Sequence, residues 1–82
     1  MITHFVIEPE VHGDELPYRV QINTVKAAGV TLVAALMRAL EMTGEVRRGT
    51  QPIEAARHLF WRYDSDGNPA WAQAIAALEG SR

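Results

Sequence analysis

The chain has 82 residues, of which 48% are hydrophobic and 22% charged, with no cysteine and a formal net charge of −2. It is too apolar for a disordered tail, too poor in glycine and proline for a fibrous repeat, and too short for two domains. We therefore expect residues 1–82 to form one small domain of limited stability, about 5 kcal/mol or a little more.

The sequence favours a cytoplasmic protein with no membrane partner. Small secreted domains commonly carry disulfides, so the absence of cysteine favours a reducing compartment. Residues 1–9 lack the basic start and the unbroken apolar run of a signal peptide. The most apolar stretch, residues 27–37, contains Gly29 and Thr31 and is much shorter than the roughly 20 residues that a membrane span needs.

Two N-terminal segments alternate between apolar and polar residues, which is typical of strands. The first covers residues 3–8. In the second, residues 18–23, Tyr18, Val20 and Ile22 fall on one face. The intervening segment Glu8–Pro17 is too long for a two-residue turn. We predict an antiparallel hairpin with a long acidic loop.

From about Thr24 the hydrophobic period becomes that of a helix. Residues 30–42 are apolar almost all round, which predicts a long central helix that ends at Gly44. Its narrow polar stripe contains Thr31, Arg38, Glu41 and Glu45. Such a helix belongs at the centre of a core or against a partner.

Two shorter helices are predicted to follow. Pro52 suits the first turn of a helix over residues 52–63, and a polar turn at 64–68 leads to a helix from Pro69 that ends at Gly80. Trp71 is expected to pack inward from this last helix. The predicted fold class is α+β: a β-hairpin packed on a long apolar central helix, followed by two shorter helices.

A two-stranded sheet leaves two unpaired edges and is marginal by itself. The segment Val46–Arg48 is one candidate for a short third strand. The other candidate is a strand added by a second copy, in a homodimer, or by a different partner.

No catalytic, metal or cofactor motif is found. Serine occurs only at Ser65 and Ser81, so a nucleophile with a neighbouring base is hard to assemble. The three histidines lack metal-ligand spacing, and the glycines form no phosphate-binding loop. The turn at 64–68 has oxygen donors suited to calcium, but Pro69 and Ile75 replace the glycine and glutamate of an EF-hand. We predict a protein that is not an enzyme and uses no cofactor.

Charge is distributed unevenly along the chain. Residues 1–23 contain four acids and one arginine, whereas residues 46–63 contain four arginines and one glutamate. If the fold separates these segments, the resulting field can steer a partner. The arginines of the second segment are Arg47, Arg48, Arg57 and Arg62.

These observations favour a small non-catalytic protein-interaction module, acting by surface masking as an inhibitor or regulator, or as a small subunit of a larger assembly. The acidic loop would meet a basic surface of a protein partner. Trp61 follows Phe60, so their side chains point about 100° apart and Trp61 is the better candidate for an exposed anchor, with Arg57 one turn before it. The predicted partner-binding residues are Glu10, Val11, Asp14, Glu15, Leu16, Arg57 and Trp61.

Two alternatives remain. One is a DNA-binding regulator that uses the arginine-rich helix over residues 52–63, although the acidic net charge and the long connection before this helix disfavour it. The other is a ligand-binding or enzymatic domain formed across a homodimer.

Overall fold

The structure is a computed structural model that describes residues 2–62 and 69–81, with only the backbone described for residues 60–62. It has a three-stranded antiparallel sheet and three helices, so the α+β prediction is confirmed. The elements in chain order are β1 (Phe5–Ile7), β2 (Tyr18–Ile22), β3 (Val25–Gly29), α1 (Leu32–Met42), α2 (Pro52–Arg62) and α3 (Pro69–Gly80).

The sheet has the strand order β1-β2-β3, with β2 in the centre. Phe5 pairs with Ile22 and Ile7 pairs with Val20, so the predicted hairpin of β1 and β2 is confirmed. Val20 and Ile22 are buried, whereas Arg19 before them is exposed and Gln21 between them is half-buried, as the alternation predicts for a strand with one covered face.

The prediction that the chain turns helical at Thr24 is wrong, because residues 25–29 form β3. A two-residue turn at Asn23 and Thr24 joins β2 to β3, and Asn23 has the positive φ of 54° that such turns require. The Asn23 side-chain oxygen also accepts hydrogen bonds from the backbone N–H groups of Thr3 and His4, at 2.7 and 3.2 Å. These long-range contacts outweigh the helix preference of the alanines in β3.

The short third strand suggested at Val46–Arg48 does not form; this segment lies in the connection between α1 and α2. The central helix α1 is also shorter than predicted, at 11 residues. Thr31 caps its N-terminus by accepting a hydrogen bond from the Ala34 amide at 3.0 Å. The predicted stop at Gly44 is confirmed, since this residue follows the helix with a φ of 78°.

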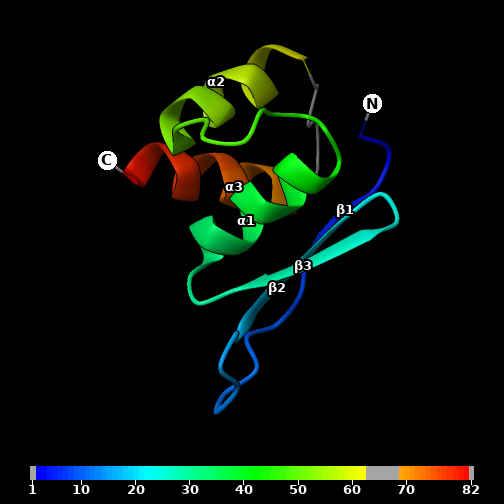
Figure 1. Ribbon diagram of the computed structural model, residues 1–82, viewed down its shortest axis with the longest axis vertical. Coiled ribbons are helices and arrows are strands. Elements are labelled where there is room, and N and C mark those ends of the chain that lie inside the picture. Colours follow the sequence, from blue (N-terminus) through cyan, green and yellow to red (C-terminus); the bar gives the residue numbers. More distant parts are fainter. Residues whose placement is uncertain (1, 63–68, 82) are drawn as a thin grey trace.

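The helices gather on one side of the sheet (Figure 1). α1 packs on β3 and β2, α3 lies against β1, and α2 packs mainly on α3. The contact between β3 and α1 is very close at Gly29. A Cβ atom at this position would lie 2.5 Å from the Ala35 backbone nitrogen, so no larger residue fits without movement.

Trp71 packs inward, as predicted, and is 4% exposed. Its ring meets that of Phe5 edge-on, with centroids 5.3 Å apart and an interplanar angle of 74°. The contact joins the first strand to the last helix. Among the described residues the buried core is entirely apolar, consisting of Phe5, Val20, Ile22, Ala27, Ala35, Leu36, Ala39, Leu40, Ala55, Ala56, Leu59, Trp71, Ala74 and Leu78.

Candidate interaction surface

The acidic loop, residues Glu8–Pro17, connects β1 to β2 and projects from one end of the molecule (Figure 1). Backbone hydrogen bonds hold its shape. The Val11 amide donates to the Pro17 carbonyl at 3.0 Å, and the Asp14 amide donates to the Val11 carbonyl at 3.3 Å. Gly13 supplies the positive φ, 84°, that the turn needs. The loop is therefore an ordered extension of the hairpin.

The side chain of Asp14 stabilises the conformation of this loop. One of its carboxylate oxygens accepts a hydrogen bond from the Leu16 amide at 3.0 Å, and the other lies 2.6 Å from the Arg19 guanidinium. The negative charge of Asp14 is thus matched by Arg19 on β2. Of the predicted partner-binding acids, Asp14 has the clearest structural role.

The other two predicted acids lie free on the loop surface. Glu10 and Glu15 are exposed, and within the described residues neither carboxylate has an ion-pair partner. Val11 and Leu16 are 38% and 39% exposed. The loop therefore combines unpaired negative charge with accessible apolar surface, a mixture common in protein interfaces.

A hollow of about 340 Å³ lies at the base of the acidic loop. Its polar lining residues are Glu8, Glu10, Tyr18 of β2 and Gln73 of α3. The other lining residues are Ile7, Pro9 and Leu32. Tyr18 and Gln73 were not predicted here, because Tyr18 shares a strand face with the core residues Val20 and Ile22, and Gln73 is distant along the chain.

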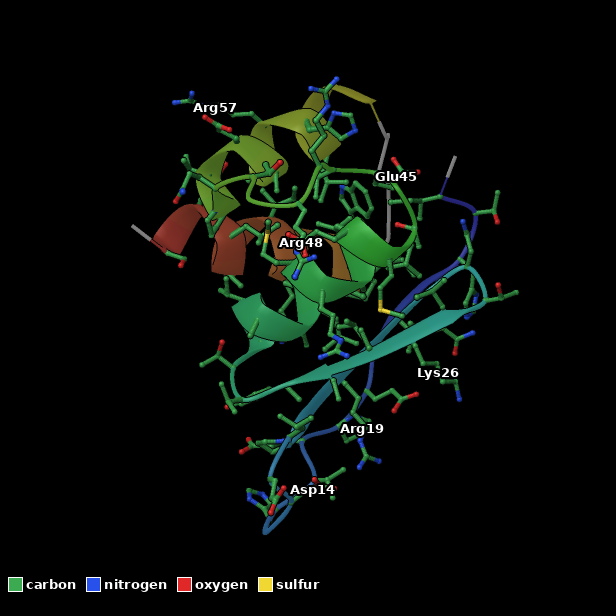
Figure 2. The ribbon with its side chains drawn as sticks, in the orientation of Figure 1. Asp14, Arg19, Lys26, Glu45, Arg48 and Arg57 are labelled. Carbon is green, nitrogen blue, oxygen red and sulfur yellow. The ribbon has the colours of Figure 1, made fainter. Side chains whose placement is uncertain are left out.

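Arg57 lies far from the acidic loop. It is exposed on α2 and appears at the opposite end of the long axis from Asp14 in Figure 2. It borders a second hollow, of about 500 Å³, with Gln51, Pro52, Ile53 and Ser81. The side chain of Trp61 lies outside the described residues. Arg57 and the loop therefore belong to two separate surfaces.

The other arginines of residues 46–63 are not gathered on one helix face. Arg47 and Arg48 are exposed in the connection between α1 and α2. Figure 2 shows Arg48 in front of α1, well away from Arg57 at the top of the view. The side chain of Arg62 lies outside the described residues, as does the predicted polar turn at 64–68.

The described histidines are dispersed. His4 and His12 are exposed, and the His58 Nε2 atom lies 3.7 Å from the Glu45 carboxylate. Across residues 2–62 and 69–81, no group of three or more histidines and acids is placed to hold a metal ion. None of the helices described here has the length and apolar character to cross a membrane.

Comparisons with family models, curated proteins and solved structures found no match for this chain.

Proposed function

We propose that this protein is a small non-catalytic interaction module that binds a protein partner through its acidic loop. It would act in the cytoplasm as an inhibitor or regulator, or as a small subunit of a larger assembly, by covering a basic surface of the partner. The acidic loop would be the main contact region, with Arg57 and Trp61 as a second one.

One observation carries this proposal: the loop is held by internal hydrogen bonds and carries unpaired charge at its surface. Four acids lie in residues 8–15, and only Asp14 has an ion-pair partner among the described residues. An ordered loop loses little conformational freedom on binding, so more of the contact energy contributes to affinity. Exposed carboxylates also speed association with a basic surface and select against acidic ones.

The hollow beside the loop suits a cationic side chain from the partner. Its lining includes the acidic residues Glu8 and Glu10 and the apolar residues Ile7 and Leu32. A lysine or arginine has an apolar stem and a charged head, and both would find complementary surface there. Val11 and Leu16 would pack beside it.

Affinity capture of the tagged protein from its native lysate tests the proposal. The bait proteins are the wild type, the loop variants Glu10→Lys and Glu15→Lys, and the control Glu79→Lys. Glu79 is exposed on α3, so its reversal changes the net charge equally at a different place. We expect one stoichiometric protein that survives nuclease treatment, is lost with either loop variant and is retained with the control. The yield should fall with rising salt.

Two results would contradict the proposal. Capture of the same protein by the wild type and both loop variants would exclude the acidic loop. Recovery of nucleic acid, or of a protein lost on nuclease treatment, would support the DNA-binding alternative. In that case charge reversal at Arg47, Arg48 and Arg57 should abolish recovery.

A further inference from the structure

The two edges of the sheet differ in how open they are. β1 is three residues long and is followed closely by Pro9, which has no N–H to donate. β3 is five residues long and contains no proline. Among the elements of the described chain, β3 contacts only β2 and α1. Figure 1 shows β3 in front of the other strands, with nothing drawn across it.

The register shows which peptide groups of β3 are unpaired. The Arg19 carbonyl accepts from Glu8 and the Asn23 amide donates to His4, so the odd-numbered residues of β2 bond to the β1 side. In an antiparallel ladder the even-numbered residues of β2 then bond to β3, through Val25, Ala27 and Gly29. The N–H and C=O groups of Lys26 and Ala28 consequently point away from the sheet. Within the described residues, no hydrogen bond reaches them.

One side of this edge is bordered by α1. Ala35 lies against Gly29 of β3, and Leu36, Ala39 and Leu40 of the same helix are also buried. Successive helix residues are 100° apart, so Arg38 and Met42 lie next to Ala35 and Ala39 on the side opposite Leu36 and Leu40. This is the side of α1 beyond β3. Arg38 is exposed and Met42 is 56% exposed.

Lys26 and Val30 lie on the other side of this edge. Lys26 is exposed and lies on the side of the sheet away from the helices (Figure 2). Val30, directly after β3, is 63% exposed. Within the described residues, neither Lys26 nor Arg38 has an ion-pair partner. The edge therefore offers two free peptide units with a cation on each side and apolar surface nearby.

We propose that β3 binds an extended acidic segment of a protein partner as a fourth strand of the sheet. Main-chain hydrogen bonds to Lys26 and Ala28 would supply affinity. Side chains of an added strand alternate between the two faces, so acidic residues would meet Lys26 on one face and Arg38 on the other. Apolar residues between them would contact Met42 and Val30.

The positive charge at the β3 edge indicates that the added strand comes from a different protein and not from a second copy of this chain. Pairing of two β3 strands about a twofold axis would bring the Lys26 and Arg38 side chains of both copies to one seam, where like charges repel. An acidic segment replaces this repulsion with attraction. This site is separate from the acidic loop, and it goes beyond the proposed function.

The test uses a phage-displayed library of linear peptides long enough to span β3, selected on the purified wild-type protein. We expect enrichment of peptides that place an acidic residue on each face of an extended strand, with apolar residues at other positions. Their affinity is then measured by fluorescence polarisation for the wild type and for Ala28→Pro. Proline removes the outward N–H of Ala28, is tolerated on an edge strand, and should weaken binding about ten-fold.

Three further variants support this comparison. Lys26→Glu should weaken the acidic peptides without touching the main chain, so the proposal remains testable if Ala28→Pro unfolds. Arg57→Glu makes the same charge change at the far end of the molecule and should leave peptide affinity unchanged. Glu10→Lys should also leave it unchanged, which distinguishes this site from the acidic loop.

Any of three outcomes would overturn the proposal. The library yields no enriched acidic peptide on the wild type; basic peptides that lose affinity for Glu10→Lys bind the acidic loop and do not count as enrichment at β3. The peptides bind Ala28→Pro and Lys26→Glu as tightly as the wild type. Light scattering shows a wild-type dimer that Ala28→Pro converts to a monomer, in which case the occupant is a second copy.

Discussion

Gly29 shows how one missing side chain determines the spacing between sheet and helix. Its backbone lies so close to the start of α1 that an added Cβ would fall 2.5 Å from the Ala35 nitrogen and 3.0 Å from the Ala34 Cβ. Both neighbours are held by the helix, so neither can move independently. The φ angle of Gly29 is not positive, so the constraint is one of space and not of backbone conformation.

We expect Gly29→Ala to lower the free energy of unfolding by about 1–3 kcal/mol, the usual cost of overpacking. Urea denaturation monitored by circular dichroism measures this loss. Gly80→Ala is the matched control: it adds the same methyl group on α3 where no atom lies within 4 Å, and it should be neutral or slightly stabilising. Equal stabilities of the two variants would show that the close approach does not exist in solution.

At the scale of elements, the hairpin of β2 and β3 depends on Asn23. This residue has a positive φ, and its side-chain oxygen accepts hydrogen bonds from Thr3 and His4 beside β1. Asn23 therefore forms the turn and also holds Thr3 and His4 against it by hydrogen bonds. The two roles can be separated by substitution.

We predict that Asn23→Gly costs about 1 kcal/mol, because glycine keeps the positive φ but loses the side-chain acceptor. Asn23→Ala should cost about 2 kcal/mol, since alanine loses the acceptor and also disfavours that backbone conformation. Thermal and urea unfolding of both variants would measure the difference. A larger loss for glycine than for alanine would contradict this explanation of the turn.

The sequence allowed some elements to be predicted and others not, for physical reasons. β2 was predictable because its alternation matches one covered face, and α2 and α3 because Pro52 and Pro69 stand at their first turns. β3 was missed because alanines have no strand preference, and what makes the segment a strand is its pairing with β2. The unpaired charge of the acidic loop was readable, whereas its internal order and the adjacent hollow depend on contacts between distant residues.

At the scale of the whole molecule, the two ends carry different chemistry. Asp14 and Arg57 lie at opposite ends of an axis 36 Å long (Figure 2). This length exceeds the Debye length of about 8 Å at physiological salt several times over, so the ends act as electrostatically independent surfaces. A partner of the acidic loop would not be affected by reversal at Arg57 unless it also contacted that end directly.

One aromatic contact joins the two halves of the chain, so we expect Trp71→Ala to remove about 3–5 kcal/mol of stability. A domain of this size has little more than that, and the variant should be largely unfolded by circular dichroism. Trp71→Phe should be milder, because a ring remains against Phe5. A double-mutant cycle of Trp71→Leu with Phe5→Leu, which removes both rings but keeps apolar volume in the core, should give a coupling of about 0.5–1.5 kcal/mol, and a coupling near zero would show that the rings do not touch.

The same contact has a consequence for synthesis of the chain. Phe5 emerges from the ribosome well before Trp71, because α3 follows all the other described elements along the chain. The β2–β3 hairpin and α1 are local and can form first, whereas the apolar side of β1 stays uncovered until α3 is complete. Folding of the sheet to its final state is therefore a late event, and a chain that stalls before residue 69 should present unburied apolar surface to chaperones and proteases.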